Sequence, residues 1–376
     1  MNKVKFLSMF VLLVLLLSAA IITVVGQEPR PQGSAEEGQI PETGAILDAV
    51  EEYFDANLQV RLGKAAPATL GRFFDQTNSD GAEALRREAT KARGFFERTE
   101  QVGPPVQSGS VEVEIGIQRV EGPAADVTVR EVLSYIILHP TLGEGETEEV
   151  FDHVLHLILS NRWLIVRDDY FDPGEDAMLA RGDFTAPTIT EVPDDLGTSP
   201  DRGAEGDDLP ETIYYNRTAA QDYADDYWDV YNPTYRDLCL SGGDCANFAS
   251  QVVFAGGYPK KWTNPRQWWY DQKGTPGNTA DDTWSSSWTG VSPQRSALDY
   301  HYGDFVASAT NLKVGDLVYM DWTGNGSWDH VAIVVVADPS GGNPLLNAHC
   351  NDRYHKSLSW FGAAANSYFH VFDSVP

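Results

Sequence analysis

The chain has 376 residues and a formal net charge of −28, with the composition of a globular protein. Its length exceeds that of one ordinary domain. The excess of acidic residues argues against a nucleic-acid partner, because contacts to phosphates require a basic face. The same charge disfavours binding to anionic membranes and to anionic wall polymers.

Residues 1–26 have the pattern of an export signal. Two lysines precede an apolar run from Phe6 to about Val25, and small residues stand at its end. The run approaches ~20 residues, which is also long enough for an uncleaved anchor. We therefore expect a secreted or extracytoplasmic protein, with no stable membrane insertion once the signal is removed. A short polar linker, 27–43, follows.

Residues 44–173 change from one apolar period to another. Apolar residues recur at helical spacing in three segments between residues 46 and 97. From residue 111 to residue 166 the spacing becomes that of strands, and it begins with Val and Ile alternating with Glu. Helices first and an antiparallel meander second predict an α+β domain.

The order of these elements resembles the cone-like fold of the nuclear-transport-factor-two-like and SnoaL-like group, and the stretch from Asn161 to Tyr170 suits its last strand. The resemblance is architectural and implies an accessory spacer or binding module. His156 alternates with leucines, which would let its side chain face inward. Together with His139 and His153 it forms no convergent catalytic set, so we expect a structural role.

Residues 174–211 are acidic and rich in proline, glycine and aspartate, which predicts a flexible linker that repels itself. The segment 212–376 returns to a regular pattern. A helix capped by Asn216 comes first, and a second helix begins at Cys245. Strands are expected around residues 317–320, 330–336, 345–349 and 367–372. This order again predicts an α+β fold, with the second helix packed against the sheet.

The second helix of this segment begins at a cysteine. Glycine pairs bracket the helix, Asp244 can cap it, and the positive end of the helix dipole favours the thiolate of Cys245. Far downstream, His330 opens an apolar run that predicts a buried strand. A cysteine at a helix start, followed in the chain by a histidine at a strand start, is the layout of papain-like thiol hydrolases.

The blocks around these residues resemble the bacterial amidase domain family that is related to NlpC-type and CHAP cell-wall peptidases. The resemblance covers about residues 214–372. It is carried by Tyr214-Tyr215-Asn216-Arg217, Ala219-Ala220, Asp222-Tyr223-Ala224, Asn232-Pro233, Asp244 to Gln251, Gly256-Gly257, Leu312 to Leu317, Asp329-His330-Val331 and Ala348-His349. The family implies a papain-like fold and a Cys–His hydrolase.

Cleavage of an amide requires a nucleophile, a proton shuttle and a place for the oxyanion. Cys245 would supply the thiolate and form a thioester, while His330 would take the thiol proton and return it to the leaving amine. His349 is our choice for the third group, because the related peptidases use a second histidine there. Asn347 and Asp352 compete with it, because sequence does not fix the register of the hairpin.

Three further residues are candidates for contacts to substrate or oxyanion. The backbone N–H of Cys245 is one expected oxyanion donor, and Tyr235 is a candidate for the second, with simple packing as the alternative. Asn247 lies in the first turn of the same helix and could serve structure instead. Trp268 is one of nine tryptophans, of ten in the chain, that fall in this segment. These tryptophans either line a groove that stacks glycan or peptide, or pack an irregular insertion.

The three cysteines allow one disulfide. If Cys245 is the nucleophile, Cys239 and Cys350 are free to pair, with two ordinary buried thiols as the alternative. The polar cluster from His349 to His355 fits no established zinc spacing. We therefore expect no metal and no cofactor.

These observations predict an exported cysteine hydrolase that cleaves an amide bond, with peptidoglycan or a peptide as its substrate. One alternative is a non-catalytic module of the same fold that binds wall or peptide through its aromatic residues. The other is a thiol acyltransferase in which an amine replaces water. The sequence predicts no oligomeric state.

Overall fold

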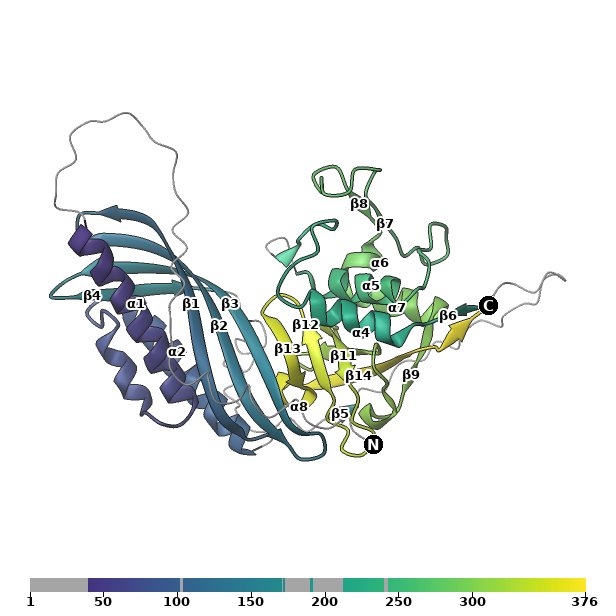
Figure 1. Cartoon of the computed structure of the whole chain (residues 1–376), viewed down its shortest axis with the longest axis horizontal. Coiled ribbons are helices and arrows are strands. Elements are labelled where there is room, and N and C mark those ends of the chain that lie inside the picture. Colours follow the sequence, from purple (N-terminus) through teal and green to yellow (C-terminus); the bar gives the residue numbers. More distant parts are fainter. Residues whose placement is uncertain (1–39, 102–103, 171, 173–189, 192–211, 240–242) are drawn as a thin grey trace, which may run out of the picture.

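The computed structural model describes residues 40–101, 104–170, 172, 190–191, 212–239 and 243–376. The predicted export signal lies outside these residues, as do the predicted linkers 27–43 and 174–211 apart from 40–43 and 190–191. No helix in this described part of the chain is long and apolar enough to cross a membrane. We call residues 40–172 the N-terminal module and residues 212–376 the C-terminal module; they lie side by side (Figure 1).

The N-terminal module begins with three helices: α1 (Ile40–Arg61), the 3-10 helix η1 (Pro67–Arg72) and α2 (Ser79–Gln101). The apolar residues of α1 recur every three or four positions, so Ile46, Val50 and Phe54 share one buried face. Since α1 begins at Ile40, it includes the last residues of the predicted linker 27–43.

Four antiparallel strands follow as a meander: β1 (Val106–Glu121), β2 (Ala124–His139), β3 (Gly143–Leu159) and β4 (Trp163–Asp169). Alternate residues of β2 are buried, because one face of the sheet packs on α1 and α2. Tyr53, Phe73, Val127 and Leu155 belong to the core between them. The predicted α+β class is confirmed for this module.

The C-terminal module also places helices before most of its strands. Its main helices are α4 (Arg217–Asp226), α5 (Cys245–Ala255), α6 (Ser286–Thr289) and α7 (Val291–His301). Its main strands are β9 (Gly303–Val306), β10 (Leu317–Asp321), β11 (His330–Val336), β12 (Leu345–Ala348), β13 (Asp352–Ser357) and β14 (Ala365–Val371). Shorter elements are β6 (Ile213–Tyr214), β7 (Tyr270–Asp271), β8 (Thr283–Trp284), η3 (Ala309–Asn311), α8 (Leu358–Phe361) and β15 (Ser374–Val375). This module is α+β as well.

The sheet of the C-terminal module has two buried faces. On the face toward α5, which we call the α5 face, Val331 and Ile333 of β11 belong to one core cluster with the helix. On the other side, which we call the opposite face, Ala332 and Val334 belong to a second cluster. Neighbouring residues of β11 therefore point into different layers, as expected for a strand.

One sheet runs through both modules. Its 11 strands follow the order β1-β2-β3-β13-β12-β11-β10-β14-β5, where β5 is Thr190–Glu191, and β4 and β9 pair with β3 and β14. The joint is an antiparallel ladder between β3 and β13, with Glu149 opposite Arg353 and Val150 opposite Asp352. The sequence predicted two domains separated by a linker. Backbone hydrogen bonds between strands far apart in the chain also join the two modules.

A buried carboxylate lies at this joint. Glu149 is fully buried and forms ion pairs with Lys356, with Arg353 Nε at 3.6 Å and with Arg61 Nη1 at 3.9 Å. Burial alone would raise the pKa of Glu149, but the three cations outweigh it and hold the pKa at about 2. Because one cation comes from α1 and two come from β13, the charge of Glu149 binds the two modules together.

Candidate active site

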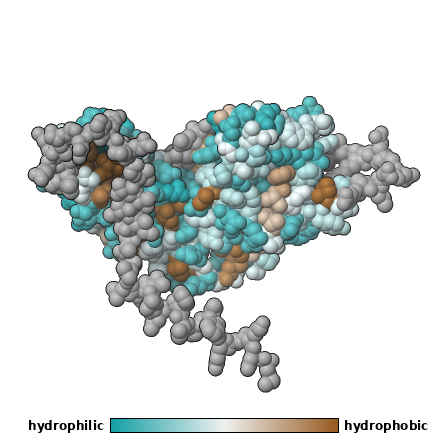
Figure 2. Space-filling view, turned by 45° about the horizontal axis from the view of Figure 1, so that its top comes forward, coloured by the Kyte–Doolittle hydropathy of each residue, from teal (hydrophilic) through white to brown (hydrophobic). Residues whose placement is uncertain are grey.

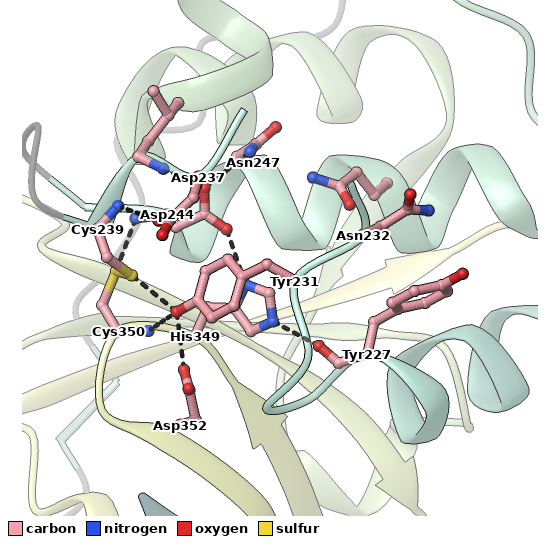
Figure 3. Close-up of polar contacts among 12 residues, drawn as sticks. Tyr227, Tyr231, Asn232, Asp237, Cys239, Asp244, Asn247, His349, Cys350 and Asp352 are labelled. Atoms are coloured by element: carbon pink, nitrogen blue, oxygen red, sulfur yellow. Dashed lines mark hydrogen bonds and ion pairs between the residues drawn. A yellow bond between two sulfur atoms is a disulfide. The ribbon is translucent and has the colours of Figure 1, made fainter. Parts of the chain in front are cut away.

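Cys245 is the first residue of α5, and the residue before it organises the approach to the helix. The sequence predicted that Asp244 caps α5, but its side chain makes no capping hydrogen bond. Its carboxylate instead accepts from Leu238 N (3.0 Å), Asn247 Nδ2 (2.7 Å) and His349 Nδ1 (2.7 Å). Asp244 therefore connects the start of α5 to the preceding loop and to the end of β12 (Figure 3).

The thiol of Cys245 is enclosed, since the residue is only 7% exposed. Burial raises the pKa of this thiol to about 11, and the neighbouring Asp244 adds to the effect. Interactions of the thiol with the backbone of Val331, Ala246 and Cys245 itself act in the other direction and lower this pKa. The thiol is therefore neutral in this closed arrangement, whereas the sequence predicted a thiolate stabilised by the helix start and an imidazolium.

His330 is the first residue of β11, and its side chain lies on the opposite face. Its ring contacts Trp322 and Phe361, with centroid distances of 5.5 and 6.1 Å, and both belong to the cluster on that face. The neighbouring Val331 is the residue that turns toward α5. Among the described residues no hydrogen bond joins His330 to Cys245, and alternation along the strand directs the side chains of His330 and Val331 to different faces.

The imidazole of His330 is neutral. Burial lowers its pKa to about 3, and the nearby positive charges of Arg353 and His349 lower it further. A neutral imidazole can accept a proton, so this ring has the charge state that a general base needs even though it faces away from the thiol.

His349, which follows β12, lies on the α5 face beside the helix. Its ring stacks on Phe248 with a centroid distance of 3.7 Å and an interplanar angle of 3°. Nδ1 donates to Asp244 and Nε2 donates to the carbonyl oxygen of Tyr227 at 2.6 Å (Figure 3). Burial lowers the pKa of His349, but the Asp244 carboxylate outweighs it and the pKa is raised. Because both ring nitrogens donate, His349 is an imidazolium that holds the helix start in place.

The two alternatives for the third catalytic group are used elsewhere. Asn347 faces α4, where its Nδ2 donates to Ala224 O at 3.0 Å and to Asp225 Oδ1 at 2.8 Å. Asp352 accepts from the Tyr231 hydroxyl at 2.9 Å, and burial raises the pKa of this carboxyl to about 6. Of the three candidates, only His349 lies beside the residue that precedes Cys245.

Of the two alternatives that the sequence left open, the structure has the disulfide between Cys239 and Cys350, with a Cα–Cα distance of 5.4 Å. Asp244 N donates to Cys350 Sγ at 2.9 Å, and the Tyr231 hydroxyl lies 2.8 Å from Cys239 Sγ. The bridge therefore fastens the loop before α5 to the turn after β12 (Figure 3). Cys245 is the free cysteine. Among the described residues, no group of three or more His, Cys, Asp or Glu side chains could hold a metal ion.

Of the three predicted substrate or oxyanion residues, Asn247 and Trp268 are buried and Tyr235 is half-buried. Tyr235 packs its ring on Tyr270 and Trp288. Asn247 is buried, and its amide donates to Asp244 and Arg236 O while accepting from Trp288 Nε1. Trp268 is fully buried, and its Nε1 donates to Ser250 Oγ at 2.9 Å. Internal hydrogen bonds hold Asn247 and Trp268, and the contacts of the three side chains with substrate stay predictions.

The remaining aromatic residues divide between core and surface. Trp288 is fully buried, whereas Trp262 is 51% exposed and stacks on Trp269 with a centroid distance of 5.1 Å. The visible face of the molecule is largely hydrophilic with small, separate hydrophobic patches (Figure 2). The predicted packing of an irregular insertion therefore describes most of these tryptophans better than a continuous groove does.

Sequence reasoning missed several residues that contact the site. The Tyr231 hydroxyl contacts the disulfide, and the carbonyl oxygen of Tyr227 accepts from His349. Both residues follow α4 in the chain. Tyr319 and Gln294 lie beneath the start of α5, where Gln294 Nε2 donates to the carbonyl oxygen of Ala246. The sequence carries no signal for this pair, because one lies in an apolar strand and the other is a single amide in a short helix.

Comparison with known proteins gives two matches. Residues 214–372 match a family described as "Putative amidase domain". The chain is also 31% identical over 173 residues to "Uncharacterized protein YhbB" of Bacillus subtilis (strain 168), a match that covers 43% of this chain. The chain spans about half the length of that curated relative, 51%. No solved structure matches the chain. The matched segment 214–372 is therefore similar to an amidase domain, and this similarity indicates hydrolysis of an amide bond.

Proposed function

We propose that the chain is a cysteine hydrolase of amide bonds with Cys245 as its nucleophile. One observation carries the proposal: the single cysteine outside the disulfide heads α5, and the backbone of two elements interacts with its thiol. These interactions favour negative charge on the sulfur, and the N–H of Cys245 also suits the oxyanion that forms when a carbonyl is attacked.

The reaction would proceed in two steps. The thiolate of Cys245 attacks the carbonyl carbon, and the tetrahedral intermediate collapses to a thioester as the amine leaves with a proton. Water then attacks the thioester and regenerates the thiol. Each step needs a group that takes a proton and later returns it.

We assign this proton transfer to His330. Its backbone is one residue from Val331, whose backbone interacts with the thiol, and its imidazole is neutral. Action as the base requires its ring to turn from the opposite face to the α5 face. His330 begins β11, so such a turn involves the end of the strand and leaves the ladder from Val331 onward in place. His349 and Asp244 then act as positioning residues that hold the helix start.

Peptidoglycan or a peptide is the proposed substrate, outside the cytoplasm. The Cys239–Cys350 disulfide supports this location, because disulfides persist in oxidising compartments. The resemblance to NlpC-type and CHAP peptidases supports the substrate class.

One observation favours a second candidate function. The enclosed thiol of Cys245 and the packing of the His330 ring on Trp322 would also suit a non-catalytic module that binds wall or peptide. Such a module would bind peptidoglycan without releasing fragments from it.

The test uses the full chain under non-reducing conditions. Purified peptidoglycan is incubated with the wild type, with Cys245→Ala and with Ser327→Ala, an exposed control. We expect the wild type and the control to release fragments with new amino groups, detected by mass analysis, and Cys245→Ala to release none. Full activity of Cys245→Ala would exclude the cysteine mechanism, new reducing ends would indicate a glycosidase, and binding without release would favour the second candidate.

A further inference from the structure

Tyr319 lies directly beneath the candidate nucleophile. In the ladder between β10 and β11, Tyr319 stands opposite Val331, and directly paired residues of neighbouring strands carry their side chains on the same face. Val331 is the residue whose backbone interacts with the thiol of Cys245. All three residues belong to one core cluster, and Tyr319 is fully buried in it. The phenol therefore lies under the first turn of α5.

The Tyr319 hydroxyl has one weak partner on a rigidly held amide. It donates to Gln294 Oε1 at 3.3 Å, near the long limit for such a bond. The NH2 group of Gln294 is occupied on the side of α5, where it donates to Ala246 O and to Ser250 Oγ at 2.6 Å. These two bonds fix which way the amide points, so its oxygen must face Tyr319. The hydroxyl is thus weakly bound, and an electrostatic interaction links Tyr319 to Cys245.

We propose that Tyr319 is a hydrogen-bond donor to the Cys245 thiolate, and that its O–H turns from Gln294 Oε1 to Sγ when the thiol ionises. The inference rests on the proposed function, since it assumes that Cys245 is the nucleophile. The thiol proton goes to the base, Tyr319 keeps its own proton, and no other bond changes. Gln294 acts as a positioning residue that keeps the hydroxyl in place while the thiol is neutral.

The surroundings allow this role. Arg295 and Asp299 of α7 are the charged groups near the hydroxyl, and Asp244 is the charged group next to the sulfur. Burial raises the pKa of Tyr319 far above its usual value, with Cys245 contributing in the same direction. The phenol therefore stays protonated across the pH range in which a thiol ionises, and it remains available as a donor.

The test measures how fast iodoacetamide alkylates Cys245 as a function of pH, in the full chain without reductant. Tyr319→Phe is compared with Tyr258→Phe, which loses a hydroxyl bonded to Phe372 O at a site away from the sulfur. We expect Tyr319→Phe to move the midpoint of the alkylation profile up by about one pH unit, and to slow alkylation near neutral pH about tenfold. Tyr258→Phe should leave the profile unchanged, and circular dichroism checks both folds.

A second variant distinguishes a Tyr319 that donates to the sulfur from a Tyr319 that only stabilises the fold. Gln294→Met removes the acceptor that competes with the sulfur, so the midpoint should move down, opposite to the effect of Tyr319→Phe. Shifts in the same direction for both variants, or no shift for Tyr319→Phe, would overturn the inference. Because alkylation needs no substrate, this result is independent of the peptidoglycan assay. An active Cys245→Ala protein would end the proposed function while leaving the alkylation profile to decide the role of Tyr319.

Discussion

Both modules contain buried histidines, and two of these, His153 and His330, are held in opposite charge states. In the N-terminal module, His153 lies 2.8 Å from Asp168 and 3.4 Å from Glu131. Burial alone would lower the pKa of His153, but the two carboxylates outweigh it and raise the pKa to about 10. In the C-terminal module, His330 has aromatic neighbours, and burial lowers its pKa to about 3. Burial neutralises a histidine unless a carboxylate accompanies it.

This difference in charge separates a histidine with a structural role from one that can take part in proton transfer. An imidazolium whose two nitrogens are bound to carboxylates has no capacity to accept a proton, so His153 stabilises the core of its module. A neutral imidazole has this capacity. His349 resembles His153 rather than His330, because it is also charged and bound at both nitrogens.

The largest expected effect comes from exchanging each histidine for asparagine. His330→Asn should lower kcat/KM roughly 10²–10⁴-fold, because it removes the group that transfers the proton. His153→Asn should destabilise the N-terminal module while kcat per folded molecule stays the same. Fragment release from peptidoglycan measures the first effect and urea unfolding the second. If His330→Asn keeps full activity, the neutral histidine is not the base and the comparison fails.

The joint between the modules gives the next largest effect. Glu149→Gln should lower the free energy of unfolding by about 3–5 kcal/mol, because it leaves three buried cations without their carboxylate. The neighbouring Glu148→Gln is the matched control, since Glu148 is half-buried and bonded only to a hydroxyl, Ser134 Oγ at 2.8 Å. We expect the control to change the free energy by less than about 1 kcal/mol. Equal effects in urea unfolding would show that Glu149 has no special role.

Removal of the disulfide should have the third largest effect. Exchange of Cys239 and Cys350 for serine should lower the free energy of unfolding by about 2–4 kcal/mol, because the unfolded chain becomes less constrained. Cys245→Ser leaves the bridge intact and serves as the control. Unfolding in urea without reductant measures both. A double variant as stable as the control would mean that hydrogen bonds alone hold the loop before α5.

Per pH unit, the smallest effect is the dependence of stability on pH. The pKa of His153 is raised from 6.5 to about 10 in the folded protein, so its stabilisation is complete below about pH 6.5 and is lost as the pH rises toward 10. The free energy of unfolding should fall by about 1.4 kcal/mol per pH unit between these values. His153→Gln should remove this slope, as measured by urea unfolding at several pH values. A slope that survives in the variant must come from another group.

Much of the fold follows from local patterns. Helical and strand periods predicted the order of elements in 44–173, and flanking glycines predicted a helix starting at Cys245. The number of cysteines showed that Cys239 and Cys350 could pair, but it left two buried thiols as an alternative. These features depend on residues close in sequence or on a simple count, so no tertiary information is needed to find them.

The features that the sequence did not predict depend on contacts between residues far apart in the chain. The run from Val331 to Val336 is apolar throughout, because both faces of β11 are buried, and such a run does not reveal which face any residue takes. The orientation of His330 therefore escaped prediction. The pairing of β3 with β13 joins residues about 200 positions apart, and no local pattern encodes such a contact. The bonds of Asp244 to Leu238 and His349 depend on the same assembly.

The ladder between β3 and β13 has a practical consequence for expression. A fragment limited to residues 212–376 would leave the edge of β13 without its neighbour and expose Arg353 and Lys356 without their carboxylate. Bare strand edges recruit other chains, so the shortened protein should precipitate or form oligomers. Anyone who wants a soluble, crystallisable version of the amidase-like half should keep the preceding residues from Ile40 onward.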